Sequence, residues 1–169
     1  MFAVGDFIAA GAGGERGRSD AAFRPGDLGR YFRGSWAFLR LLRDAATGRD
    51  GSIIGRADFA SEEGGLRYRE RGRMVFAGHR GLAERAYRFR LTGPGRAEVL
   101  FADGRFFHAL DLTRGIDGVE HLCGDDLYRG RYALEDAQRW ALRWRVRGPG
   151  KDLLLTTRYL RFGSAAART

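Results

Sequence analysis

The feature that most constrains the fold is a series of short segments that alternate apolar and charged residues, with a turn signal after almost every one. In residues 138–147, for example, a face carrying Trp140 and Trp144 opposes a face of arginines. Successive side chains of a strand point to opposite faces, so this period indicates strands with one buried face. No segment has the spacing of a long amphipathic helix. The sequence therefore predicts an all-β protein.

We expect about nine or ten strands joined by hairpin-length links. The expected strands are residues 36–44, 52–61, 66–76, 82–92, 96–102, 105–113, 118–123, 126–134, 138–147 and 152–161. Asp103-Gly104 between two apolar runs is a strong hairpin signal. An antiparallel sheet with one apolar face buries that face by closing on itself. We therefore predict a closed antiparallel up-and-down β-barrel.

The boundaries of this barrel follow from composition. Residues 1–22 are rich in glycine and alanine and predict a flexible lead-in, whereas 23–163 form one domain and 164–169 a C-terminal tail. Pro25-Gly26-Asp27 predicts a turn and a helix cap, and apolar residues within 28–32 have helical spacing. We expect a short helical turn there that plugs one end of the barrel.

The chain carries a formal net charge of +9, but this charge is not gathered on one element. Lys151 is the only lysine, and arginines occur along almost every expected strand. We interpret them as a solvated outer face, which disfavours nucleic acid as a partner. An interaction module that binds RNA or anionic lipid through this basic surface remains an alternative.

Several absences indicate the compartment. No apolar run approaches the roughly 20 residues of a membrane-spanning helix, and Asp6 interrupts the short apolar stretch at the N-terminus, which makes a poor signal peptide. Cys123 is the only cysteine, so no intramolecular disulfide can form. We predict a cytoplasmic protein without a membrane span; the oligomeric state stays open.

The inward faces predict an aromatic interior that either is filled or contains a ligand pocket. Tyr87, Trp140 and Trp144 lie on such faces and would supply contact area for a ligand. Gly55 and Ala57 place small residues on another face, which suits a bent strand or room for a guest.

A polar cluster follows the aspartate-glycine turn, with His108 on the apolar face of its strand beside Phe106 and Leu110. The other members of the cluster are Arg105, His121, Cys123, Asp125, Asp126 and Tyr128. Two interpretations are open. In one, the histidine is a core residue whose ring nitrogens are hydrogen-bonded and the cysteine is a small buried side chain; in the other, these groups orient the polar end of a ligand.

A metal or catalytic role has less support from the spacing. His121-x-Cys123 supplies two donors, with Asp125 or His108 as a third, but no second closely spaced pair is present. Catalysis by Cys123 with His121 lacks an orienting group and an oxyanion-hole motif. Whether the protein is an enzyme stays open.

Gly34-x-Trp36 directly before a strand, with an arginine in the last strand, resembles the calycin group, which includes lipocalins and fatty-acid-binding proteins. The resemblance implies that Trp36 closes the barrel by stacking beneath Arg158, with Arg161 as the other candidate. Some calycin-like barrels bind haem through one histidine, so haem on His108 or His121 is an alternative.

The chain from about residue 32 to 162 also resembles a family known as a domain of unknown function. The resemblance depends on Gly34-x-Trp36, Asp103-Gly104-Arg105-x-Phe107-His108, His121-x-Cys123-Gly124-x-Asp126-x-Tyr128-x-Gly130, Gly148-Pro149-x-Lys151 and Thr157-x-Tyr159. It implies a self-contained domain and supplies no activity.

Together these patterns predict a barrel of calycin type that binds a small, largely apolar molecule in its interior. A polar or anionic group of that molecule would be oriented by His108, His121, Tyr128 and Arg105.

Overall fold

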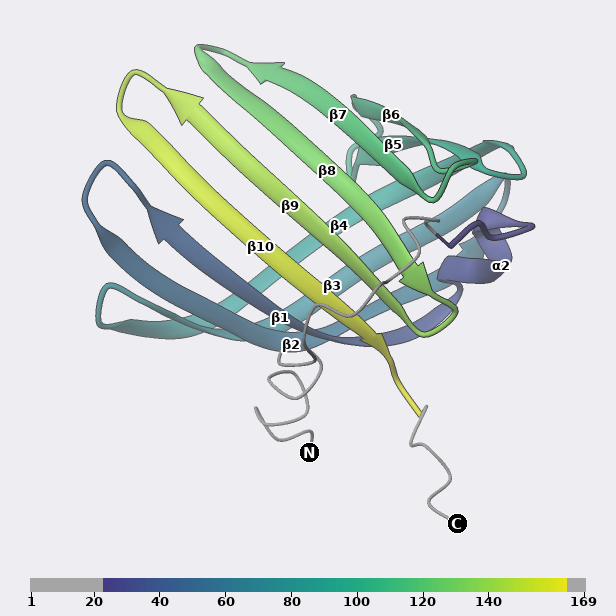
Figure 1. Cartoon of the computed structure of the whole chain (residues 1–169), viewed down its shortest axis with the longest axis horizontal. Helices are drawn as coiled ribbons and strands as arrows, with labels where there is room; N and C mark the ends of the chain where they lie inside the picture. The colour runs from purple at the N-terminus through teal and green to yellow at the C-terminus, as the bar shows by residue number, and fades with distance from the viewer. Residues whose placement is uncertain (1–22, 164–169) are drawn as a thin grey trace, which may run out of the picture.

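The computed structural model describes residues 23–163, which form a ten-stranded antiparallel sheet and one short helix (Figure 1). The elements are α2 (Leu28–Phe32), β1 (Gly34–Asp44), β2 (Arg49–Glu62), β3 (Gly65–Phe76), β4 (His79–Gly93), β5 (Arg96–Phe101), β6 (Phe106–Asp111), β7 (Ile116–Cys123), β8 (Asp126–Asp136), β9 (Arg139–Gly148) and β10 (Lys151–Arg161). The prediction of an all-β chain is confirmed. The predicted lead-in and C-terminal tail lie outside the described residues.

The first strand pairs with the last, as barrel closure requires. β1 and β10 are joined from Trp36 opposite Arg161 to Asp44 opposite Leu153. The strand order is β6-β5-β4-β3-β2-β1-β10-β9-β8-β7, which leaves β6 and β7 at its two ends. Within residues 23–163 no backbone ladder joins these two strands, but the Asp111 amide donates to the Asp117 carboxylate across 2.7 Å. The barrel is therefore nearly closed, with one seam.

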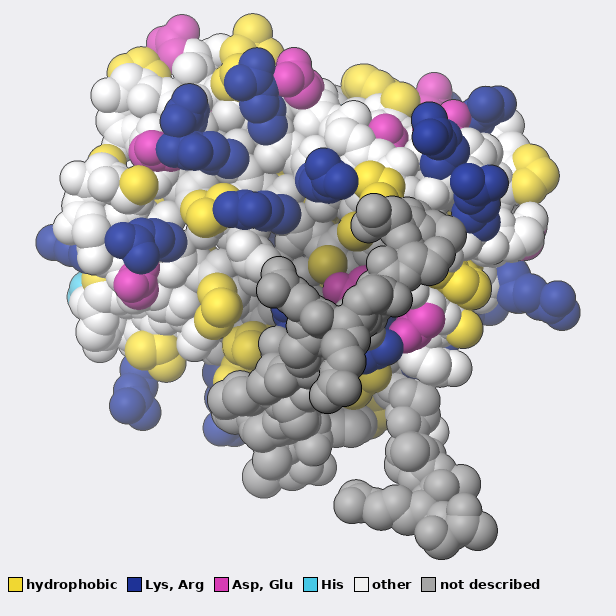
Figure 2. Space-filling view, in the orientation of Figure 1, with side chains coloured by type: hydrophobic (Ala, Val, Ile, Leu, Met, Phe, Trp, Pro, Cys, Tyr) yellow, Lys and Arg dark blue, Asp and Glu magenta, His cyan; other side chains and the backbone are white. Residues whose placement is uncertain are grey.

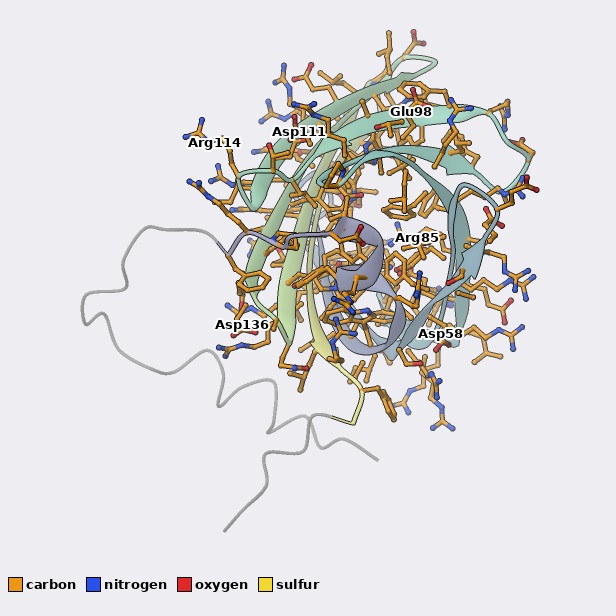
Figure 3. The ribbon with its side chains drawn as sticks, turned by 90° about the vertical axis from the view of Figure 1, so that its right-hand side faces the viewer. Asp58, Arg85, Glu98, Asp111, Arg114 and Asp136 are labelled. Atoms are coloured by element: carbon orange, nitrogen blue, oxygen red, sulfur yellow. The ribbon has the colours of Figure 1, made fainter. Side chains whose placement is uncertain are left out.

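Helix α2 closes one end of the barrel. The Asp27 side chain accepts a hydrogen bond from the Arg30 amide and begins the helix. Phe32 is fully buried, stacks on Phe59 at a centroid distance of 5.0 Å and meets Trp140 edge-on at 5.1 Å. Figure 3, which looks at this end, shows the helix lying across the ring of strands. The predicted helical plug is present.

Trp36 lies under an arginine, but the arginine is Arg161 and not Arg158. The Arg161 guanidinium carbon is 4.1 Å from the centroid of the Trp36 ring, whereas Arg158 is exposed. Trp36 and Arg161 are direct partners across β1 and β10, so their side chains share a face. Arg158 lies three residues earlier and points to the opposite face. The prediction for Arg158 was wrong for this reason.

This arrangement predicts that Arg161→Ala destabilises the protein much more than Arg158→Ala. Arg161 also donates to the Arg33 carbonyl at 3.0 Å, so its loss removes a hydrogen bond as well as the cation–π contact. We expect Arg161→Ala to lower the free energy of unfolding by about 1–3 kcal/mol and Arg158→Ala by under about 0.5 kcal/mol. Urea denaturation measures both, and equal losses would contradict the arrangement.

Gly55 makes room for backbone and not for a guest. It lies opposite Gly72 in the β2–β3 ladder, and a Cβ added at Gly55 would collide with the Arg71 carbonyl and the Gly72 Cα. The neighbouring strands therefore come close together here only because both positions lack a side chain. The space beside Gly55 is therefore occupied by the backbone of β3, and the expectation of room for a guest at this glycine was wrong.

Candidate ligand-binding site

The barrel interior contains a cavity at the end opposite α2. Its volume is about 180 Å³. The lining residues come from β4, β6, β8, β9 and β10: Arg85, Tyr87, Phe107, Tyr128, Trp144, Val146, Lys151, Leu153 and Leu155. A smaller space of about 20 Å³ lies deeper and is also lined by Arg85, Tyr87, Phe107 and Trp144, together with Trp140. The interior is thus packed toward α2 and open toward the β9–β10 hairpin.

Three parallel aromatic rings form one wall of the cavity. The Phe107 ring stacks on Tyr87 at 5.5 Å and 14°, and on Trp144 at 5.4 Å and 21°. Gly130 lies behind Trp144, where a Cβ would come within 2.7 Å of the indole and displace it. The wall is aromatic and mainly apolar, which suits an apolar guest.

A β-bulge places Phe107 in this wall. Val99 of β5 pairs with His108, and the next residue, Leu100, pairs with Phe106. Phe107 is therefore an extra residue in β6 at this point. As a result Phe107 is buried, whereas Phe106 is 55% exposed. The expectation that Phe106 shares the inner face with His108 was wrong, because simple alternation does not continue through a bulge.

A buried ion pair lies beside the deep end of the interior. Arg40 donates to both oxygens of Glu70, at 2.6 and 2.9 Å, and both side chains are 4% exposed. The Arg40 Nε also donates to the Thr157 hydroxyl at 2.8 Å, and the Tyr68 hydroxyl donates to Glu70. This bidentate pair is charge-assisted and geometrically specific.

The protonation states within this cluster follow from burial and the neighbouring charges. Burial alone would raise the pKa of Glu70, but the Arg40 hydrogen bond and the charges of Arg85 and Arg40 outweigh it and lower that pKa to about 2. Burial raises the pKa of both Tyr68 and Tyr159. Glu70 is therefore a carboxylate, and the two phenols are neutral.

Arg85 joins this cluster to the open cavity. Its Nε lies 3.0 Å from Glu70 Oε1, and its guanidinium lies 5.4 Å from the Tyr87 ring centroid. Figure 3 shows Arg85 inside the ring of strands. Sequence reasoning missed Arg85, Arg40 and Glu70, although a signal existed. Arg85 has the same parity as Tyr87 on β4, which places both on the inner face.

His108 is a satisfied core residue. It is 2% exposed, its Nδ1 lies 3.0 Å from the Ala109 carbonyl, and its Nε2 lies 3.3 Å from the Tyr132 hydroxyl. A carbonyl only accepts, so Nδ1 carries the proton and the Tyr132 hydroxyl donates to Nε2. Burial lowers the pKa of His108 to about 4, so the ring is neutral at neutral pH. Both ring nitrogens are occupied.

His121 and Tyr128 lie nearer to the opening. His121 packs edge-on against Phe107 at 4.8 Å and against Tyr128 at 6.2 Å. Tyr128 lines the cavity, whereas His121 is in contact with two residues that do. The Phe107 ring lies against both histidines, with His108 at a centroid distance of 4.7 Å.

Two of the residues selected from the sequence lie outside the interior. Arg105 is 78% exposed in the β5–β6 turn and pairs with Asp103. Cys123 is exposed at the end of β7. In the described part of the chain, no cluster of three or more histidine, cysteine or acidic side chains could hold a metal ion. The spacing of His121 and Cys123 therefore does not become a metal site within residues 23–163.

The interior does not fit haem. The cavity of about 180 Å³ is only slightly larger than an engineered apolar cavity of about 150 Å³ that holds one benzene. A porphyrin macrocycle is several times larger than benzene. His108 offers no free nitrogen to a metal, since both are hydrogen-bonded.

Residues 32–161 match the model of a family described as a family of unknown function, DUF6314. The chain belongs to this family. The DUF6314 match lies within the domain 23–163 predicted from the sequence. Among proteins with curated functions, none matches the sequence.

Solved structures with the same architecture are distant in sequence. An S-type phycobiliprotein lyase, CPES, from Guillardia theta superposes with a TM-score of 0.58 at 9% identity, over 78% of this chain and 89% of the lyase chain. Rv2717c from M. tuberculosis gives a TM-score of 0.50 at 17% identity, over 78% and 92% of the two chains. At identities this low, the TM-scores show a shared fold alone, which confirms the predicted antiparallel β-barrel.

A third structure is a protein of unknown function from the DUF3598 family of Nostoc punctiforme. It superposes with a TM-score of 0.59 at 12% identity and covers 86% of this DUF6314 chain. The present chain spans about half of that protein, 52% of its length.

The described residues contain no helix long and apolar enough to cross a membrane.

Proposed function

We propose that this DUF6314 barrel binds a small, largely apolar molecule in its interior. The observation that carries the proposal is the cavity of about 180 Å³ opposite α2, walled by Tyr87, Phe107 and Trp144. Clefts that bind small molecules are mostly apolar with a few convergent polar groups. Tyr128, Arg85 and Lys151 are the polar residues that line this one.

The geometry revises the roles expected from the sequence. Tyr87, Tyr128 and Trp144 line the cavity, and Trp140 lines the deeper space. His121 supports the wall through Phe107. His108 orients Tyr132 and not the ligand, and Arg105 and Cys123 take no part in the site that we propose.

The alternatives have less support from the structure. A cysteine nucleophile would be at the surface, since Cys123 is exposed. Figure 2 shows lysine and arginine side chains scattered over one face between apolar and acidic ones. Many are paired, such as Arg129 with Glu120 and Arg145 with Asp152. Because these side chains are already in ion pairs, the surface gives weaker support for binding RNA or anionic lipid than the cavity gives for binding a small molecule.

A cytoplasmic location remains a prediction from the sequence.

The proposal is tested with the neutral one-ring dye 4-(dimethylamino)benzonitrile, whose fluorescence rises in apolar surroundings. We expect a saturable rise in fluorescence with one dye per chain. Leu155→Trp, which puts an indole into the cavity, should abolish the rise.

The matched control is Leu154→Trp. Leu154 neighbours Leu155 on β10 but does not line the cavity, and it pairs with Arg145 on the outer face. We expect the control variant to bind the dye as the wild type does. No saturable signal from the wild type, or equal signals from both variants, would show that the interior does not receive ligands.

A further inference from the structure

Among the described residues, the ionised cluster beside the cavity carries one more positive charge than negative charge. It consists of Arg40 and Glu70, each 4% exposed, and Arg85, which is 27% exposed, and Glu70 alone is negative. Lys151, at the opening, is already paired with Asp126. A charge in a poorly solvated site is costly unless it has a partner, so the surplus cation requires an explanation.

Arg85 is that surplus cation. Both oxygens of Glu70 already accept from Arg40, and Oε2 also accepts from Tyr68. The Nε of Arg85 is buried and lies 3.0 Å from Glu70, yet it makes no hydrogen bond within the described residues. Arg85 is thus held in place by attraction to Glu70, with donors left over.

The position of Arg85 gives those donors access to a ligand. Arg85 lines both the cavity of about 180 Å³ and the deeper space of about 20 Å³, so it lies where the two meet. Tyr87, Phe107 and Trp144 line both spaces as well. A ligand in the cavity can therefore contact Arg85 and these three rings at the same time.

We propose that the cavity binds a flat aromatic carboxylate, with its carboxylate against Arg85 and its ring along Tyr87, Phe107 and Trp144. This inference depends on the proposed function and names the class of ligand. One negative charge neutralises the surplus of the cluster, whereas a dianion would bury a second charge without a partner. The guanidinium fork matches a carboxylate in shape.

The size of the cavity limits the ring system. An apolar cavity of about 150 Å³ holds one benzene, and this one measures about 180 Å³ and opens to solvent. One or two fused rings therefore fit, with the outer edge of the ligand near Lys151.

The test compares 2-naphthoate with 2-naphthamide by isothermal titration calorimetry at neutral pH. The two molecules have the same size and shape and differ in charge. A charge-assisted hydrogen bond is worth about ten- to a hundredfold in affinity, so we expect 2-naphthoate to bind at least about tenfold more tightly. 2-Naphthyl phosphate, a dianion, should bind more weakly than 2-naphthoate.

Arg85→Gln should remove the preference, so that 2-naphthoate binds no more tightly than 2-naphthamide. Arg88→Gln is the matched control, because it removes a cation from the outer face of the same strand, where Arg88 pairs with Glu62, and it should keep the preference. Arg85→Lys preserves the charge of the cluster and should keep part of the preference. It decides the matter if Arg85→Gln does not fold.

The outcomes separate this inference from the function on which it depends. If 2-naphthamide binds and 2-naphthoate does not bind more tightly, the proposed ligand-binding function is supported and the role of Arg85 is refuted. A preference that is kept in Arg85→Gln, or tighter binding of the phosphate, refutes it too. If neither naphthalene binds the wild type, the proposed function and the inference both fail.

Discussion

Replacing Glu70 with glutamine will lower the free energy of unfolding by about 3–5 kcal/mol, because it leaves the buried Arg40 guanidinium and the partly exposed Arg85 guanidinium without a carboxylate. Glu70 is 4% exposed and holds Arg40 in a bidentate pair. Glutamine keeps the shape but presents an amide NH₂ toward a donor. Urea denaturation at neutral pH measures the loss.

The pH dependence of this loss identifies its cause. The pKa of Glu70 is lowered from 4.5 to about 2 in the folded protein, so its carboxylate contributes stability above about pH 4.5. That contribution disappears as the pH falls through about 2. The difference in stability between the wild type and Glu70→Gln should therefore shrink over this range. A difference that stays constant with pH would assign the loss to packing.

Glu84→Gln is the control for Glu70→Gln. Glu84 pairs with Arg71 at 3.1 Å on the outer face of the neighbouring strand, where the two side chains are 60% and 72% exposed. Exposed ion pairs contribute about 0–1 kcal/mol. We expect the control to stay within that range. A loss as large as that of Glu70→Gln would mean that charge in general, and not this buried cluster, stabilises the barrel.

Trp36→Ala will lower the free energy of unfolding by about 3–5 kcal/mol, the range for a buried tryptophan truncated to alanine. Trp36 is fully buried, and its Nε1 donates to the Phe32 carbonyl at 2.8 Å. Its ring also contacts Trp140 edge-on at 6.2 Å and lies beneath Arg161. The substitution opens a cavity where α2 closes the barrel.

Two variants bracket this effect. Trp36→Phe keeps much of the volume and loses the hydrogen bond to the Phe32 carbonyl, so we expect a smaller loss of about 1–3 kcal/mol. Leu41→Ala removes a side chain that is 54% exposed on the same strand, and its cost should stay under about 1 kcal/mol. Thermal unfolding ranks the three. If Trp36→Ala cost no more than Leu41→Ala, the closed end would not depend on the tryptophan.

The fold could be predicted because its signals are local. Alternation with a period of two, and turn residues such as Asp103-Gly104, are properties of a few neighbouring residues. The pairing of β1 with β10 follows once every strand has its apolar face on the same side. The bulge at Phe107 could not be predicted, because an extra residue becomes visible only against the partner strand.

The candidate site was predicted in part, for a similar reason. Tyr87, Tyr128 and Trp144 lie on apolar faces, and the same rule that identified them would have placed Arg85 inside. Residue type favours the opposite prediction for Arg85, because charged residues are mostly exposed. Cys123 and Arg105 were selected for their chemistry, but they lie at strand ends and turns, where alternation no longer decides which way a side chain points.

The sequence by itself determined the strands, their inward faces where no bulge intervenes, and the aromatic character of the interior, since each depends on the spacing of nearby side chains. Tertiary structure alone decided that Arg161 covers Trp36, that Glu70 is shared between Arg40 and Arg85, and that a space stays open beside Arg85. These features join residues distant in the chain. Their positions depend on strand register and packing, which a local pattern does not contain.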